Sequence, residues 1–267
     1  MKITLKRLTL VCLFIFIGLK ASSQTVTLDN YYNQETKKSS SGEMVRFHYQ
    51  WDEREMSGFS ILGDAFKKNG AKELKTLNTA PSKAKLEETD IFIIVDPDNL
   101  KDNPQPNYIT ENEAKAIAGW VKAGGVLLIL ANDNVNADLD HLNILAEKFG
   151  FTFNKDLILH VIDDQHFADG EVVFQENEIF TNTKNIFIKD ASSITIKGLA
   201  KAILKTTDGK NVMVSTPYGK GNVLAIGDPW LYNEYVNGRL PSKYDNDKAA
   251  DEIASWLLKK VNRFKKN

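Results

Sequence analysis

The sequence predicts an α/β protein with a doubly wound, mostly parallel sheet. Two continuous apolar runs, residues 91–95 and 126–130, have the composition of strands that are buried on both faces. Segments with helical spacing alternate with these runs, as is typical of a parallel sheet with helices on both faces. The pattern changes after Gly150, where residues 151–217 predict a strand-rich C-terminal excursion that leads into a hairpin.

The first 23 residues predict a secretory signal peptide. Basic residues precede the apolar run 8–19, which is too short to span a bilayer, and small residues stand at the expected cleavage position near Ser23. Cys12, the one cysteine of the sequence, lies inside this run and lacks the small residues of a lipoprotein box. We therefore expect residues 24–267 to form a single periplasmic or secreted α/β domain without disulfides, thiolate metal sites or a membrane span.

The charge balance narrows the classes of partner. Removal of the four positive charges of the signal lowers the formal net charge from −1 to −5. A mildly acidic exported protein is a poor candidate for non-specific nucleic-acid binding, so no nucleic-acid partner is expected. An apolar content of 42% is enough for a substantial core.

The elements of the first third begin after a polar segment, residues 24–42, which we interpret as a leader strand or loop. Alternating or helical spacing then predicts, in order, a strand at 45–49, a helix at 59–69 that Gly70 ends, a strand at 73–77 and a short helix at 80–86.

The later elements have clearer boundaries. Thr110 and Glu113 have the spacing of a capping box for a helix that runs to Lys122 and ends at a glycine pair. The remaining predicted elements are a helix at 139–149, a hairpin of strands 211–216 and 222–226, and a final helix at 247–264.

Polar and aromatic residues follow four of the predicted strands. Ligands bind outside the carboxyl ends of the strands in open α/β sheets, so we expect these residues to converge on one site. The candidates are His48, Trp51 and Asp52 after the first strand, Asp96 after 91–95, Asn132 and Asp133 after 126–130, and Asp228, Trp230, Tyr232 and Asn233 after the hairpin, with Arg239 nearby.

Each candidate also has a structural interpretation. Asp96 suits a turn with the proline that follows it, Asn132 suits a helix cap, and His48 suits a hydrogen-bonded core position. The acidic loop 163–171 contains possible calcium ligands but does not match the twelve-residue calcium loop. No nucleophile elbow, phosphate-binding loop or dinucleotide fingerprint occurs, and we expect no cofactor and no metal.

Four segments together resemble a known family, the amidotransferase-like domain that is appended to unsaturated uronyl or rhamnogalacturonyl hydrolases of Bacteroidetes. The element order is also similar to class I glutamine amidotransferases and flavodoxin-like domains. Those amidotransferases carry a cysteine elbow where this chain has Ala131, Asn132 and Asp133, which excludes their chemistry. The four segments are Phe47-His48-Tyr49-Gln50-Trp51-Asp52 with Gly58-Phe59-Ser60, Ile94-Val95-Asp96-Pro97-Asp98, Trp120-Val121-Lys122-Ala123-Gly124-Gly125 and Gly227-Asp228-Pro229-Trp230-Leu231-Tyr232-Asn233-Glu234-Tyr235.

As a stand-alone secreted chain, the protein is similar to the oligosaccharide dehydratases of marine ulvan-degradation loci. The resemblance implies that it eliminates water from the non-reducing-end uronic acid of an anionic, uronic-acid-containing oligosaccharide. The product would be a 4,5-unsaturated uronate, which is the substrate of unsaturated uronyl hydrolases and links the protein to them functionally. The resemblance assigns no catalytic residue.

Roles for the candidates follow from the chemistry of that elimination. Removal of the C5 proton requires a base, for which we choose His48, and a clamp on the neighbouring carboxylate, for which we choose Arg239. Tyr232 is the alternative base, or the acid that protonates the departing hydroxyl. The other candidates would bind the sugar. Trp51 and Trp230 would stack on the ring, and Asn132 and Asn233 would act as neutral hydrogen-bond donors. The aspartates would hold the hydroxyls of the sugar or orient the base; these are Asp52, Asp96, Asp133 and Asp228.

Two other function classes are also compatible with the sequence. The chain could be a non-catalytic carbohydrate-binding or accessory module of a polysaccharide-utilisation system, since aromatic and amide side chains at strand ends serve sugar binding equally well. A purely structural periplasmic role would leave the four polar strand ends unexplained. The net negative charge also opposes an anionic substrate unless positive charge gathers locally.

Overall fold

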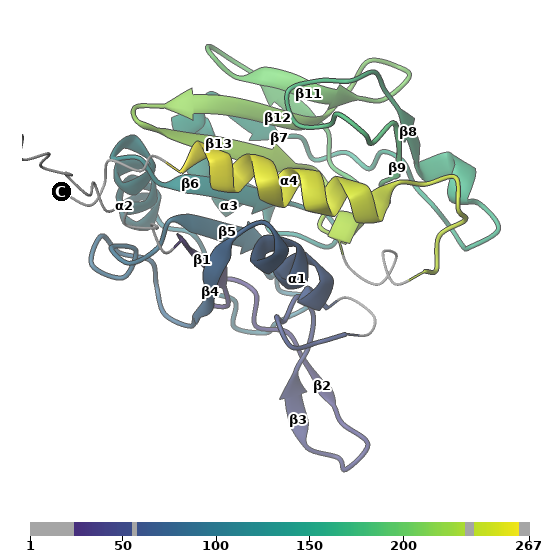
Figure 1. Cartoon of the computed structure of the whole chain (residues 1–267). Helices are drawn as coiled ribbons and strands as arrows, with labels where there is room; N and C mark the ends of the chain where they lie inside the picture. Colours follow the sequence, from purple (N-terminus) through teal and green to yellow (C-terminus); the bar gives the residue numbers. More distant parts are fainter. Residues whose placement is uncertain (1–23, 55–57, 233–237, 262–267) are drawn as a thin grey trace, which may run out of the picture.

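The computed structural model describes residues 24–54, 58–232 and 238–261, with the side chain of Tyr232 excepted (Figure 1). The expected signal peptide, with Cys12, lies outside the described residues. So does Asn233.

A seven-stranded sheet forms the centre of the molecule. Its strand order is β11-β12-β13-β6-β5-β1-β4. The five strands β13, β6, β5, β1 and β4 run parallel to one another, whereas β12 is antiparallel to both β13 and β11. The strands are β1 (Gln24–Asp29), β4 (Ala71–Leu77), β5 (Ile91–Val95), β6 (Val126–Leu130), β11 (Lys201–Lys205), β12 (Asn211–Tyr218) and β13 (Gly221–Ile226).

The predicted fold class, a doubly wound sheet of the amidotransferase-like or flavodoxin-like type, is wrong. The sheet is mixed, and the described residues contain only four α-helices. The difference comes from the long segment between α3 and β13. It contributes short strands outside the main sheet and then the antiparallel strands β11 and β12. The short strands are β7 (Phe151–Phe153), β8 (Glu171–Val173), β9 (Asn185–Phe187) and β10 (Ile194–Ile196).

The four helices form two layers. Helices α1 (Ser60–Lys68) and α4 (Asn246–Lys260) pack against each other and share one apolar cluster with the sheet (Figure 1). Helices α2 (Glu111–Lys122) and α3 (Leu139–Ala146) contribute to a second apolar cluster. No helix in the described part of the chain is long and apolar enough to cross a membrane.

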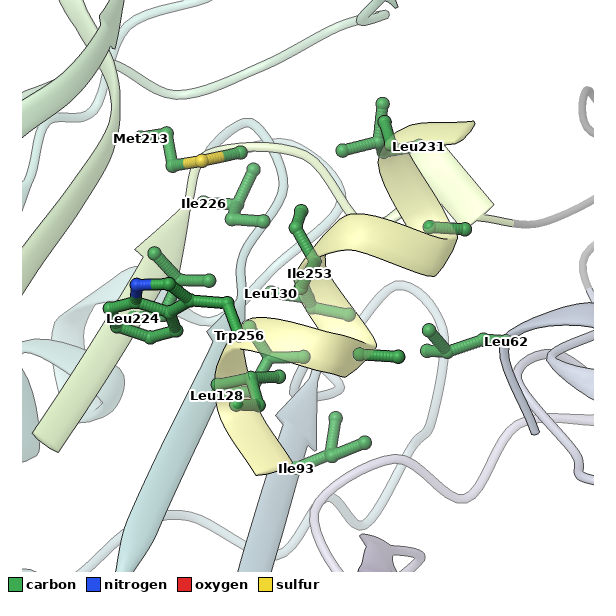
Figure 2. Close-up of a cluster of buried hydrophobic side chains, with 14 of the residues drawn as sticks. Leu62, Ile93, Leu128, Leu130, Met213, Leu224, Ile226, Leu231, Ile253 and Trp256 are labelled. Atoms are coloured by element: carbon green, nitrogen blue, oxygen red, sulfur yellow. The ribbon is translucent and has the colours of Figure 1, made fainter. Parts of the chain in front are cut away.

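Helix α4 closes the larger of these clusters. Figure 2 shows Ile253 and Trp256 of α4 beside Leu128 and Leu130 of β6, with Leu224 of β13 in the same group. Full burial of such side chains stabilises a fold by roughly 1.5–3 kcal/mol each. The sheet thus depends on the C-terminal helix for the cover of this face.

Several predicted elements are confirmed. The strands at 91–95 and 126–130 are β5 and β6, and all of their residues are buried. The capping box of α2 is present, since Thr110 Oγ1 accepts from the Glu113 N–H and Glu113 Oε2 accepts from the Thr110 N–H at 2.8 Å. The hairpin of strands 211–216 and 222–226 forms as β12 and β13.

The polar leader, for which a strand or a loop was predicted, contains the strand β1, which lies between β4 and β5. Val26 and Leu28 of β1 point into the core, and their threonine neighbours are also buried. Two other predictions for the N-terminal third are wrong. The predicted strand 45–49 is not part of the sheet. Instead β2 (Thr36–Lys38) and β3 (Met44–Arg46) form a two-stranded ribbon that projects from the body (Figure 1). Residues 80–86 form turns and not a helix.

Candidate functional site

A hollow of about 250 Å³ lies beside the ends of β5 and β6. Asp96 directly follows β5, and Asn132 comes two residues after β6. The other walls come from the base of the β2–β3 ribbon and from loops of the C-terminal half. The lining residues are Glu35, His48, Tyr49, Asp96, Asp102, Asn132, Asn136, Asp190 and Trp230.

Unusual backbone conformations gather at this hollow. His48, Tyr49, Asp96 and Asp190 have φ angles of 63°, 51°, 42° and 53°, in the left-handed region that L-residues seldom adopt. Only one further non-glycine residue of the described chain has a positive φ. Such strain costs on the order of 1–3 kcal/mol per residue and concentrates at functional sites, so this hollow is the best candidate for one.

A buried carboxyl forms the floor of the hollow. The Tyr49 hydroxyl donates a hydrogen bond of 2.8 Å to Oδ2 of Asp96, and the Asn132 amide donates to the same oxygen at 3.4 Å. Oδ1 of Asp96 is buried and has no hydrogen-bond partner among the described residues. Burial, and then the nearby Glu35, raises the pKa of Asp96 well above its ordinary value, so its neutral form persists to higher pH than in an exposed aspartate.

The ribbon brings a histidine and a carboxylate together. Glu35 precedes β2 and His48 follows β3. The Phe47 N–H donates to the Glu35 carbonyl at 3.0 Å and closes the base of the ribbon. Nδ1 of His48 lies 2.8 Å from Oε1 of Glu35, an arrangement that orients the ring. The pair is therefore equipped to accept a proton at Nε2.

The ribbon base is anchored by an arginine. Arg46 Nη2 donates to the Asn33 carbonyl at 2.6 Å and also contacts the Asn30 side-chain oxygen. Burial lowers the pKa of Arg46, while the charges of Asp98 and Asp29 raise it. These contacts fix the ribbon, and with it Glu35, relative to β1.

A second wall of the hollow contains Asp190 and Trp230. Asp190 Oδ1 lies 2.8 Å from Nδ1 of His160, and Lys189 Nζ lies 4.9 Å from the centre of the Trp230 ring. Beneath them, the buried Asp228 carboxylate accepts from the Lys189 N–H at 2.9 Å and from the Trp230 N–H at 2.6 Å. Asp228 thus joins the two segments that line this wall.

Acidic groups dominate the electrostatics of the site. Burial, and then Glu35, raises the pKa of Asp102, and burial raises the pKa of nearby Asp98 to about 6. Two cations stand beside the hollow: Lys189, at 3.8 Å from Asp190 Oδ2, and Lys101, whose Nζ donates to Asn136 Oδ1 at 2.8 Å. In the described part of the chain, no group of three or more His, Cys, Asp or Glu side chains is arranged to hold a metal ion.

Four of the residues expected from the sequence meet at this hollow: His48, Asp96, Asn132 and Trp230. Asp133 and Asp228 are buried. Asp228 accepts from two backbone N–H groups, and Asp133 accepts from the Val135 N–H and the Asn136 side-chain amide of its own turn. The side chain of Tyr232 and the whole of Asn233 lie outside the described part.

The structure does not bring the remaining candidates to the hollow. Trp51 donates from Nε1 to the Lys75 carbonyl at 2.9 Å and packs against Phe66 of α1. Asp52 is exposed. Arg239 makes a bidentate ion pair with Asp164, at 2.9 Å from Nε and 2.6 Å from Nη2, and does not line the hollow.

The sequence did not assign three acidic lining residues. Glu35 lies in the polar leader, Asp102 in a loop and Asp190 in the strand-rich excursion, so no periodic pattern marks them. A His–carboxylate pair across distant segments leaves no local spacing signal. The positive φ angles that single out Asp190 are visible only in the folded chain.

Comparisons with known proteins relate this chain to others by fold. No family model matches it, and no curated protein matches it. The structure is similar to the mmIFT52 N-terminal domain, with 15% identity, 88% of this chain and 97% of that chain covered, and a TM-score of 0.64. This structural neighbour and the mixed sheet both contradict the predicted doubly wound fold class.

Two further solved structures are similar. A cytoplasmic protein from Salmonella typhimurium LT2 has 13% identity over 90% of this chain and 100% of its own, with a TM-score of 0.58. A β-galactosidase from Bacillus circulans sp. alkalophilus has 11% identity over 89% of this chain but only 31% of its own, with a TM-score of 0.50. At these identities the similarity shows the fold alone.

Proposed function

We propose that the protein is a dehydratase, a carbon–oxygen lyase that eliminates water from the non-reducing-end uronic acid of an ulvan-type oligosaccharide. The observation that carries the proposal is the meeting of a Glu35-oriented His48 with the buried Asp96–Tyr49 pair in one strained hollow. Elimination next to a carboxylate needs a base at C5 and a setting that tolerates the growing negative charge on that carboxylate.

His48 serves as the base in this proposal. Its Nδ1 is engaged by Glu35, and Nε2 takes the C5 proton, so the positive charge that develops on the ring is stabilised by the adjacent carboxylate. The favoured neutral form of Asp96 lessens the repulsion of an anionic substrate by the floor. The amides of Asn132 and Asn136 supply neutral donors for the uronate carboxylate.

The second wall supplies binding groups. Trp230 offers an aromatic surface for the apolar face of a sugar ring, and Lys189 beside it places positive charge at the same wall. Lys189 and Lys101 take the place of Arg239, which is engaged by Asp164, as sources of positive charge for the uronate. The product of this reaction is a 4,5-unsaturated uronate that an unsaturated uronyl hydrolase would consume.

The test is direct. The purified protein is incubated with uronate-ended ulvan oligosaccharides, and the product is followed by the ultraviolet absorbance of an unsaturated uronate and by the loss of one water in the mass spectrum. His48→Asn is the matched inactive variant, because asparagine tolerates the left-handed backbone that position 48 requires. We expect its turnover to fall by about 10²-fold or more. Wild-type protein that yields no unsaturated product would refute the proposal.

Carbohydrate binding without turnover is the second candidate function. It is favoured by the similarity to part of a β-galactosidase, in which a region of this fold forms less than a third of a longer glycosidase chain. In that case the wild-type protein binds the oligosaccharides in calorimetry, Trp230→Ala weakens the binding, and no unsaturated product forms.

A further inference from the structure

The four histidines of this sequence all place Nδ1 against a carboxylate, but the pairs are of two kinds. Two pairs join residues three positions apart, which is ordinary local turn or helix geometry. The other two join segments that are distant in the chain. The local pairs are His141–Asp138 at 2.7 Å and His166–Asp163 at 2.6 Å, and the long-range pairs are His48–Glu35 and His160–Asp190, both at 2.8 Å.

Both long-range pairs have a carboxylate in the wall of the candidate site. Glu35, His48 and Asp190 line the hollow, and His160, which is not itself a lining residue, is hydrogen-bonded to Asp190 at the rim. The local pairs do not contribute to its lining. Residues that are distant in the chain come together only in the folded protein. Because both long-range pairs border the same hollow, we look for a role that they share.

The backbone around His160 is strained in the same manner as that around His48. Leu159 and Asp190 each have a φ of 53°, and the Asp190 N–H donates to the Leu159 carbonyl at 3.0 Å. The Val161 N–H also donates to Asp190 Oδ1, at 3.2 Å, so the residues on either side of His160 both bind Asp190. The left-handed residues therefore hold His160 in place beside Asp190.

We infer that Asp190 and His160 form the second proton-transfer pair of the hollow, with His160 as the general acid for the departing C4 hydroxyl. The inference rests on the proposed dehydratase function. Nε2 of His160 has no partner among the described residues, and its side chain is 56% exposed, so it can regain a proton from water after each turnover. Asp190 orients the ring.

The proton balance of the reaction is then complete. His48 takes the C5 proton, the C5–H electrons form the C4–C5 double bond, and the C4–O bond breaks. The departing hydroxyl takes a proton from His160 and leaves as water. His48 then releases its proton to solvent and His160 regains one, so the net reaction is uronate to unsaturated uronate plus water.

A substrate with a different leaving group distinguishes a general-acid role of His160 from a purely structural role. Wild type, His160→Gln and His48→Asn are compared on a uronate-ended oligosaccharide and on its 4-deoxy-4-fluoro analogue. Fluoride is a far weaker base than hydroxide and departs without a proton from the enzyme. We expect His160→Gln to lose about 10²-fold in kcat on the hydroxyl substrate and most of that loss to disappear on the fluoride. His48→Asn should be impaired on both.

His166→Gln is the control, because it also removes a histidine–carboxylate pair, but a local one at an exposed position that does not line the hollow. A His160→Gln variant that loses no more turnover than His166→Gln, or that loses equally on both substrates, overturns the inference while the dehydratase function stands. Wild-type protein that forms product from neither substrate overturns both.

Discussion

The Tyr49 hydroxyl donates to Oδ2 of Asp96 at 2.8 Å, although both residues are buried and both have left-handed backbone. Burial also raises the pKa of the Tyr49 hydroxyl well above its ordinary value, so the bond joins two groups that are favoured in their neutral forms. A neutral floor suits an anionic ligand.

Asp96→Asn should keep the affinity for the anionic oligosaccharide, because asparagine is a neutral isostere that also tolerates a left-handed backbone. In wild type, the affinity should fall as the pH rises through the pKa of Asp96, since an ionised carboxylate repels the ligand. The variant should lack this decline. Calorimetric titrations of both proteins over a series of pH values measure it. Parallel declines in both proteins would contradict the prediction.

Glu35→Gln should lower turnover through its effect on His48. If the carboxylate acts by orienting and charging the imidazole, the double variant Glu35→Gln/His48→Asn should be no slower than His48→Asn alone, because the two residues act as a unit. A kcat comparison of the four proteins measures this coupling. Asp138→Asn removes the corresponding partner of His141 and serves as the control. Fully multiplicative losses would show that Glu35 acts independently.

Arg239→Ala should change kcat/KM by no more than about twofold. Its guanidinium is engaged by Asp164 in a pair whose side chains are 38% and 50% exposed, and such pairs contribute about 0–1 kcal/mol to stability. Steady-state kinetics and a thermal melt of this variant and of Asp164→Ala are sufficient. A large loss of turnover in Arg239→Ala alone would restore the carboxylate-clamp role expected from the sequence.

Asp228→Asn should alter the pH dependence of stability. Burial raises the pKa of Asp228 to about 7, so the folded state binds a proton more tightly than the unfolded chain. The free energy of unfolding of wild type therefore falls as the pH rises from about 4 through about 7, by an amount on the order of a few kcal/mol from this group. The variant lacks this component, so denaturant unfolding at about pH 5 and about pH 8 should show wild type losing more stability.

Glu252→Gln provides the control for that experiment. Burial acts to raise the pKa of Glu252, but hydrogen bonds from Thr181, Asn182 and Thr183 lower it to about 2. The carboxylate is then ionised in both folded and unfolded states between about pH 5 and about pH 8. The variant should be destabilised by a constant amount over that interval. A constant offset for Asp228→Asn as well would contradict the expected titration of Asp228.

Gly227→Ala and Gly119→Ala should have opposite effects on stability. A Cβ at Gly227 would lie 1.9 Å from the Ser192 carbonyl oxygen, which belongs to the backbone and cannot move aside, so we expect a loss of at least about 1–3 kcal/mol. A Cβ at Gly119, in the middle of α2, meets no atom within 4 Å. Alanine there should stabilise the protein by about 0.5–1 kcal/mol. Denaturant midpoints measure both.

The sequence predicts the parts of this site that follow buried strands. The apolar runs of β5 and β6 are unambiguous, and the polar residues directly after them, Asp96 and Asn132, had to lie at that edge of the sheet. His48 reaches the hollow for a reason that the sequence did not predict. It was expected at the end of a sheet strand, but it lies in a left-handed turn after the ribbon.

Other features depend on contacts that have no local signature. The sequence left open whether the leader is a strand or a loop, because threonines alternate with the core residues of β1. A buried hydrogen bond between Thr27 and Thr89 satisfies one of these threonines. The mixed character of the sheet arises from the strands β11 and β12, whose pairing partners are fixed by tertiary packing. Asp190 lines the hollow only because the segment between α3 and β11 packs against the main sheet in the folded chain.

Because α4 covers β6 and β13, the packing of this helix also determines when folding can be completed. β6 is synthesised well before its parallel neighbour β13, and α4, which shields Leu128 and Leu130, is the last helix of the described chain. Pairings between such distant segments slow folding, because a long loop must close first. Until α4 has been synthesised, that apolar face has no permanent partner, so incomplete chains are the species most prone to aggregate.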